Sequence, residues 1–226
     1  MRFRDRREAG RALVPLLAHL RQANPLVLAL PRGGVPVAAE IAEALDAPLD
    51  ILIVRKLGAP GYPEFAAGAV VEGHPPEVVR NEEAVRALGI GQDYLDAEAI
   101  RQCAEIERQQ ALYRQGRAPL PWRDRTLILV DDGIATGSTV RAALLALRRP
   151  GAGRRVVLAA PVAPDSTAAA LRTVCDEAVF VETPADFGAV GAFYEDFGQV
   201  GDAEVIALLD RAVARHAEGA AGGARE

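Results

Sequence analysis

The chain is poor in aromatic residues, cysteine and lysine, and it has no long run of apolar residues. Aromatic side chains make up 5% of its 226 residues, so Ala, Val and Leu must build most of the core. Each apolar run ends within about eight residues at a proline or a charge, which is too short for a transmembrane helix. The amino-terminal stretch MRFRDRREAGRAL is charged throughout and lacks the apolar centre of a signal peptide. These features predict a cytoplasmic protein with no membrane partner.

The cysteines and the net charge also limit the kinds of ligand or partner that the chain could bind. Cys103 and Cys175 do not have the spacing of metal ligands, which favours two reduced thiols. A net charge of −5 argues against nucleic acid as the main partner, and neither a helix-turn-helix nor a basic patch is present. Lysine occurs once, as Lys56, in a chain whose other basic residues are arginines.

The order of the remaining segments indicates one α/β domain over residues 1–218. Short, fully apolar runs, typical of strands covered on both faces, alternate with segments of helical periodicity. This alternation predicts βαβ units and a parallel sheet with helices on both faces. The expected helices include 5–20 and 35–45, and the expected strands include 25–31, 49–55, 66–73, 125–132, 154–164 and 177–183.

Three segments depart from this alternation. Residues 78–118 read as a helical insertion, and its long charged helix, 93–116, is either a solvated face, a docking face or a homodimer contact. Residues 184–215 begin with a segment that has no strand pattern and is rich in aromatics, which predicts a cap. Residues 219–226 are small and polar, and we expect a disordered tail.

The stretch VDDGIATGST, residues 130–139, carries the clearest chemical signal. Asp131 and Asp132 end a buried strand, and a turn over 133–137 leads into a helix near Ser138. Ligands of open α/β sheets bind beyond the carboxyl ends of the strands. A helix amino terminus offers unpaired N–H groups and partial positive charge, which suit a phosphate. The alternative is an ordinary strand–turn–helix in which the two acids serve as caps.

The acids beside such a phosphate need partners of another kind. Carboxylates accept hydrogen bonds from hydroxyls and bind Mg²⁺. A phosphate, a diol and a divalent cation together describe a ribose 5-phosphate. The segment is not a Walker A loop, because no Gly-Lys-Ser/Thr follows.

This segment resembles the signature of the type I phosphoribosyltransferases, and the whole chain is similar to a bacterial branch of that family that carries FRDRREAG and PRGG. The resemblance implies a parallel sheet flanked by helices, with a small cap (hood) subdomain. It implies an enzyme that binds Mg²⁺ with 5-phosphoribosyl 1-pyrophosphate (PRPP) and transfers the phosphoribosyl group to a small nitrogen base, releasing pyrophosphate. Asp131 and Asp132 are the implied ribose and Mg²⁺ ligands, and Ala135, Thr136, Gly137, Ser138 and Thr139 form the implied phosphate loop.

Two further segments acquire roles from this resemblance. In PRGGVPVA, Arg32 supplies a charge and Gly33 and Gly34 a backbone free to turn, which suits a pyrophosphate, although a plain turn with a surface arginine would look the same. Arg55 and Lys56 resemble the basic pair that meets pyrophosphate in adenine phosphoribosyltransferases, where a flexible loop follows. We therefore expect residues 57–67 to form a mobile lid.

The acceptor site is the least defined part. Enzymes for 6-oxopurines usually carry an acid where this chain has Ala135, which disfavours hypoxanthine and guanine. Glu72 is placed loosely like a catalytic glutamate of the adenine enzymes, and with Lys56, Asp131 and Asp132 it completes the expected catalytic set; an unremarkable strand-end glutamate is the alternative. Both features point toward purine salvage. Phe187, Phe193 and Tyr194 could stack on a base or simply form the core of the cap.

Two other functions would use the same predicted binding residues. One is a non-catalytic sensor of PRPP or a nucleotide, which would control a protein partner. The other is a hydrolase of PRPP or a nucleotide, which a looser lid would permit.

Overall fold

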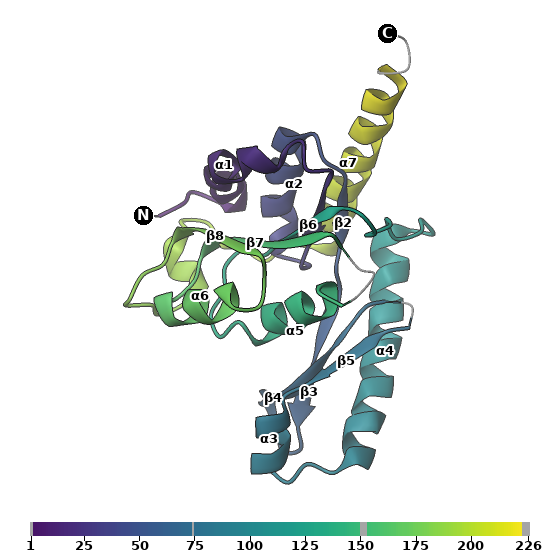
Figure 1. The fold of residues 1–226 in the computed structure, drawn as a ribbon, viewed down its shortest axis with the longest axis vertical. Coiled ribbons are helices and arrows are strands. Elements are labelled where there is room, and N and C mark those ends of the chain that lie inside the picture. Colours follow the sequence, from purple (N-terminus) through teal and green to yellow (C-terminus); the bar gives the residue numbers. More distant parts are fainter. Residues whose placement is uncertain (1, 74, 150–152, 223–226) are drawn as a thin grey trace.

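A five-stranded parallel sheet forms the centre of the molecule (Figure 1), in a computed structural model that describes residues 2–73, 75–149 and 153–222. The strand order is β2-β1-β6-β7-β8, and β1 pairs in register with β6 from Pro25 opposite Thr126 to Ala29 opposite Val130. Every residue of β1 and β6 is buried, so the prediction of a parallel sheet covered on both faces is confirmed. The strands are β1 (Pro25–Ala29), β2 (Leu49–Ile51), β6 (Thr126–Val130), β7 (Arg155–Val162) and β8 (Glu177–Glu182).

Helices cover both faces of this sheet because alternate strand residues point to opposite sides. On β1, Val27 and Ala29 pack in one cluster with α1, α2 and α7, whereas Leu26 and Leu28 pack in another with α5 and α6. Figure 1 shows the two helical layers above and below the strands. Their bounds are α1 (Arg6–Leu17), the 3-10 turn η1 (Ala18–Leu20), α2 (Gly34–Leu45), α5 (Ser138–Leu147), α6 (Asp165–Arg172) and α7 (Asp202–Gly222).

A second lobe extends from the edge of the sheet (Figure 1). It contains an antiparallel sheet of order β3-β4-β5, with the helices α3 and α4 beside it. The predicted insertion, 78–118, therefore begins with a strand and not a helix, and it completes a sheet with the two strands before it. The elements are β3 (Val54–Ala59), β4 (Tyr62–Val71), β5 (Glu77–Arg80), α3 (Glu82–Ala87) and α4 (Gln92–Arg114).

The predicted lid lies at the tip of this lobe. Residues 57–67 form the end of the β3–β4 hairpin, and Gly61 supplies the left-handed conformation (φ +73°) at the turn. The register of the hairpin shifts at two places next to Gly58. The segment is thus paired strand in this conformation of the chain.

A buried ion-pair network joins the lobe to the central sheet. Arg114, near the end of α4, donates to Asp50 at 3.0 Å, to Glu72 at 2.7 Å and to the carbonyl of Ile51 at 2.9 Å. Arg114, Asp50 and Glu72 are all buried. Since an unpaired buried charge is strongly destabilising, these contacts fix α4 against the sheet edge.

The carboxyl-terminal part differs from the predicted cap. Residues 183–201 are irregular apart from the short helix η2 (Val190–Phe193), but α7 packs along α2, and Arg215 donates to the carbonyls of Ala42 and Ala47. The cap is therefore shorter than 184–215. Residues 219–222 continue α7 where a disordered tail was expected, and 223–226 lie outside the described residues. Among the described residues, the helices are too short or too polar to cross a membrane.

Candidate functional site

The two acids of the VDDGIATGST segment lie at the carboxyl end of β6, as the sequence predicts. Both are partly buried, and the amide of Asp132 donates to Oδ1 of Asp131 at 2.9 Å. Burial and the neighbouring charge of Asp132 raise the pKa of Asp131 well above its usual value. Burial also raises the pKa of Asp132, but the guanidinium of Arg6 opposes that shift.

The loop that follows the acids leads into α5 without any charged or side-chain cap. Ile134 is buried and anchors the loop through a hydrogen bond to Val162, while Thr136 and Ser138 are exposed with hydroxyls 3.4 Å apart. The first turn of α5 contains no acidic residue, and Gly137 makes no side-chain cap. The unpaired amides and exposed hydroxyls together form a surface suited to an anion.

Gly137 is required here for two structural reasons. Its φ is +72°, a left-handed conformation that glycine adopts readily. A β-carbon would also lie 2.9 Å from Cγ2 of Thr167 and 3.3 Å from Cδ1 of Leu171, both on α6. Backbone conformation and packing on α6 therefore account for a glycine at this position.

The PRGG turn adjoins the acid pair. A β-carbon on Gly33 would lie 2.0 Å from Oδ2 of Asp132, and one on Gly34 would lie 2.7 Å from the carbonyl oxygen of Val130. The peptide bond between Pro31 and Arg32 is cis, and α2 begins at Gly34. Arg32 is 3.6 Å from Asp202, the first residue of α7. The two glycine-containing loops therefore meet at the carboxyl ends of β1 and β6. The residues predicted to bind pyrophosphate thus lie beside those predicted to bind the ribose.

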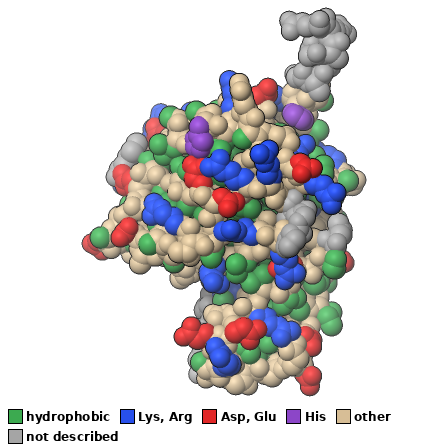
Figure 2. Space-filling model, viewed as in Figure 1, with side chains coloured by type: hydrophobic (Ala, Val, Ile, Leu, Met, Phe, Trp, Pro, Cys, Tyr) green, Lys and Arg blue, Asp and Glu red, His purple; other side chains and the backbone are tan. Residues whose placement is uncertain are grey.

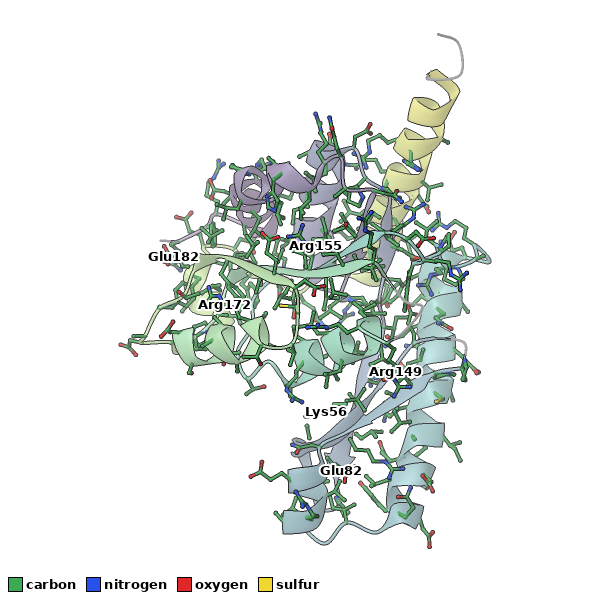
Figure 3. All side chains as sticks on the ribbon, viewed as in Figure 1. Lys56, Glu82, Arg149, Arg155, Arg172 and Glu182 are labelled. Atoms are coloured by element: carbon green, nitrogen blue, oxygen red, sulfur yellow. The ribbon has the colours of Figure 1, made fainter. Side chains whose placement is uncertain are left out.

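Arg55 and Lys56 lie on opposite faces of the second sheet. Nε of Arg55 donates to Gln102 of α4 at 3.1 Å. Lys56 pairs with Ala69, which lines a cavity of about 300 Å³ together with Ser138 of the phosphate loop. Figure 3 labels Lys56 on the side of the lobe away from α4, and Figure 2 shows an indentation in the outline between this lobe and the body. Lys56 is thus on the face of the second sheet that is opposite to Arg55 and α4.

Glu72 occupies the buried network described above. Its Oε1 accepts from Arg114 at 2.7 Å, and its Oε2 accepts from Arg114 and from Gln110 at 3.1 and 2.8 Å. Both carboxylate oxygens are therefore engaged by α4. The catalytic role expected for Glu72 stays a prediction, and its contacts are those of a residue that positions α4.

The aromatic residues of the cap pack mainly on one another. Phe187 and Phe193 stack with centroids 5.4 Å apart, and Tyr194 is buried against Phe3 and Phe197. The hydroxyl of Tyr194 donates to the backbone carbonyl of Asp132 at 2.5 Å. Tyr194 therefore has no free ring face for a base, whereas the partly exposed edges of Phe187 and Phe193 stay available.

Arg6 is the residue of this site that the sequence reasoning missed. Its Nε donates to Oδ2 of Asp132 at 2.7 Å, across 126 positions of sequence. The signal was present in the arginine-rich segment FRDRREAG, which was used only to exclude a signal peptide and to mark the family resemblance. Nothing in the spacing of that segment indicates which acid an arginine would meet.

The acid pair suits a divalent cation only if other ligands contribute. Asp131 and Asp132 supply carboxylate oxygens, which Mg²⁺ prefers. Within the described residues, no group of three or more His, Cys, Asp or Glu side chains could hold a metal ion. The donor set therefore fits Mg²⁺ that arrives with substrate oxygens and water, as Mg²⁺ commonly binds with phosphates.

Comparisons with known proteins give relatives along most of the chain. Two proteins of Mycobacterium tuberculosis, from strains CDC 1551 / Oshkosh and ATCC 25618 / H37Rv, carry a phosphoribosyl transferase name and are each 46% identical over 219 residues. The matches cover 97% of this chain and 49% of each relative, so the chain spans about half the length of these curated relatives. The protein TT1426 from Thermus thermophilus, known from a crystal structure, is 47% identical with a TM-score of 0.81, and the match covers 92% of this chain and 98% of that one.

The family comparison includes both loops of the site. Residues 6–190 match the family model described as the phosphoribosyl transferase domain. The matched range contains the PRGG turn, the acid pair and the loop at the start of α5. The chain therefore belongs to the phosphoribosyl transferase domain family.

Proposed function

We propose that this chain is an enzyme that transfers the 5-phosphoribosyl group of PRPP to a nitrogen acceptor and releases pyrophosphate. The observation that carries the proposal is the junction of the PRGG turn with the acid pair, where Gly33 adjoins Oδ2 of Asp132. A pyrophosphate on the turn and a 5-phosphate on the loop at the start of α5 would then lie on either side of the ribose. One PRPP molecule has these three parts in this order.

Each part of the proposed site has a definite task. Backbone amides and hydroxyls of residues 135–139 bind the 5-phosphate, and Asp131 and Asp132 accept hydrogen bonds from the ribose hydroxyls. The amides near Gly33 and Gly34, with Arg32, bind the pyrophosphate. Lys56 reaches the same anion from the second lobe as a compact charge.

The proposed reaction needs no covalent nucleophile from the protein. The bond from C1 of the ribose to the pyrophosphate oxygen breaks, and a bond from C1 to the acceptor nitrogen forms. Charge builds on the leaving pyrophosphate while the ribose becomes oxocarbenium-like, as in glycoside chemistry. Arg32 and Lys56 stabilise the departing anion, and the fixed dipoles of the two loops need no reorganisation during the step.

A divalent cation is part of the proposal. Mg²⁺ would enter with PRPP, held by Asp131 and Asp132 directly or through water, and it would neutralise charge on the pyrophosphate. Arg55 and Glu72 are not assigned to substrate, because α4 engages their side chains.

The acceptor is proposed as a nucleobase without a 6-oxo group, and purine salvage in the cytoplasm is the setting in which such an enzyme would act. Ala135 supports the choice, since an acid at this position is what 6-oxopurine enzymes carry. Phe187 and Phe193 are partly exposed and belong to the same segment as Tyr194, whose hydroxyl bonds to the carbonyl of Asp132. A homodimer would be compatible with the exposed face of α4, on which Ile100 is 72% exposed.

A screen of PRPP and Mg²⁺ against many nitrogen acceptors, with pyrophosphate release as the signal, tests the proposal. Acceptor-dependent release is expected. Release that does not depend on an acceptor would contradict the transferase and indicate a hydrolase. PRPP binding without release would indicate a sensor. The variant in which Asp131→Asn and Asp132→Asn are combined is the control, and it should bind PRPP weakly and release no pyrophosphate.

A further inference from the structure

The amino-terminal segment and the cap hold each other beside the acid pair. Residues 2–6 run next to 193–198, and we call these two segments the latch. The amide of Phe3 donates to Phe193 at 2.8 Å, and the amide of Glu195 donates back to Phe3 at 2.8 Å. The family match covers residues 6–190, so it includes Arg6 but not the other residues of the latch.

Arg6 connects the latch to the site. Its Nε donates to Oδ2 of Asp132 at 2.7 Å, its Nη1 donates to the carbonyl of Gly198 at 2.7 Å, and its guanidinium carbon lies 4.0 Å from the ring centroid of Phe197. The side chains of Arg6 and Asp132 are only 12% and 14% exposed. A planar guanidinium held at three points cannot rotate freely, so it fixes the carboxylate that it binds.

The latch also forms a hydrogen bond with the backbone of Asp132. The hydroxyl of Tyr194 donates to its backbone carbonyl at 2.5 Å, and the ring of Tyr194 packs on Phe3. Oδ2 of Asp132 is thus enclosed by Arg6 and the backbone of Gly33. The contacts at Oδ2 and at the backbone carbonyl together fix the orientation of this carboxylate.

The charge of Arg6 changes what the acid pair attracts. Two adjacent, partly buried carboxylates would concentrate negative charge and draw in a bare divalent cation. With Arg6 bound to Asp132, its positive charge makes the cluster less negative than the acid pair alone. A neutral hydroxyl suits this charge better, since it needs an oriented acceptor and not a strong field.

We propose that Arg6 is a positioning residue that orients Asp132 for a ribose hydroxyl and makes the acid pair select a ribose phosphate over a free divalent cation. This inference rests on the proposed function. It predicts that loss of Arg6 changes the two affinities in opposite directions. General loosening of the fold would weaken both.

Three variants separate charge, hydrogen bonding and packing. Arg6→Met keeps the apolar stem against Phe197 but removes the charge and the donors. Arg6→Lys keeps the charge and replaces the planar fork with a compact ammonium. Arg7→Met is the matched control, because Arg7 is the next residue of α1 and pairs with Glu40 at 3.3 Å, away from the acids. Circular dichroism and thermal melts establish that each variant is folded.

Two probes are used. Binding of ribose 5-phosphate without metal is measured by calorimetry, and binding of Mn²⁺ alone is measured by its electron paramagnetic resonance signal. Arg6→Met should bind ribose 5-phosphate about tenfold more weakly, the loss expected for one hydrogen bond to a charged group. It should bind Mn²⁺ about tenfold more tightly, because a neighbouring positive charge has gone. Arg6→Lys should restore the Mn²⁺ affinity but only part of the sugar affinity, and Arg7→Met should match the unmodified protein in both.

The outcomes distinguish this inference from the proposed function. If the unmodified protein does not bind ribose 5-phosphate, the ribose assignment fails with the proposed function. If it binds the sugar phosphate but Arg6→Met changes neither affinity, or lowers both equally, the positioning role alone is wrong.

Discussion

The backbone of Gly33 lies directly against the carboxylate of Asp132, so that a β-carbon at residue 33 would sit 2.0 Å from Oδ2. The φ of Gly33 is −59°, an ordinary helical value, so the residue is not needed for an unusual backbone. Space is therefore the reason for glycine. The contact couples the PRGG turn to the acid pair, and each loop restricts the position of the other.

Replacing this glycine tests the coupling without straining the backbone. Gly33→Ala should displace Asp132 and weaken PRPP binding by about thirtyfold, which corresponds to about 2 kcal/mol, the middle of the range for overpacking. Gly188→Ala in the cap is the control, since nothing lies within 4 Å of its β-carbon position. Calorimetric titration with PRPP measures both variants. Equal affinities for the two would mean that the turn and the acids act independently.

The buried partners of Glu72 lead to a prediction about stability. Glu72→Gln leaves Arg114 buried with only one carboxylate, Asp50, and should lower the free energy of unfolding by about 3 kcal/mol, as when a buried pair loses one partner. Urea titration measures the loss. Glu105→Gln, which breaks an exposed pair with Arg108 on the same helix, should cost much less. Unchanged stability together with abolished turnover would instead support the catalytic role for Glu72 expected from the sequence.

The split between Arg55 and Lys56 gives a pair of variants with opposite expectations. Lys56→Arg should lower turnover although it keeps the charge, because a wide planar fork cannot replace a point charge close to one phosphate oxygen. Arg55→Lys should affect turnover less, since its partner is Gln102 of α4. Steady-state kinetics with PRPP as the varied substrate compares them. Full turnover in Lys56→Arg would mean that the reaction does not require a lysine at this position.

The parallel sheet and the position of the acid pair could be predicted from the sequence because their signals are local. Fully apolar runs such as residues 25–30 mark buried strands, and the acids follow directly on one of them. Residues 78–80 were expected in a helical insertion but form a strand, because they pair with residues 68–70 of β4, and a pairing partner is not visible in a short segment. Residues 202–215 were expected in the cap, but they belong to α7, which packs along α2.

The long-range contacts of the site could not be predicted for a related reason. Arg6 meets Asp132 across 126 positions, and Glu72 meets Arg114 across 42. Each pairing depends on how helices dock on the sheet, and a chain with 26 basic and 31 acidic residues offers many alternative pairs. Composition alone cannot rank them.

The loop at the start of α5 allows the most direct test of the proposed phosphate site. Inorganic phosphate should shift the backbone amide resonances of residues 135–139, since these groups lack partners at the helix amino terminus. Ser138→Ala removes one exposed hydroxyl and should weaken phosphate binding by about 1.5–3 kcal/mol, because the hydrogen bond has a charged partner.

Gly137→Ala would be a poor choice of variant for this test. Its β-carbon would meet Thr167 of α6 at 2.9 Å and its φ is unfavourable, so a loss of phosphate binding could not be separated from a loss of packing. Thr173→Ala, on an exposed hydroxyl that donates to Ala170, is a control that should leave phosphate binding unchanged. Amides of 135–139 that stay still while phosphate shifts another region would mean that the loop is a turn between two packed elements and that the phosphate binds elsewhere.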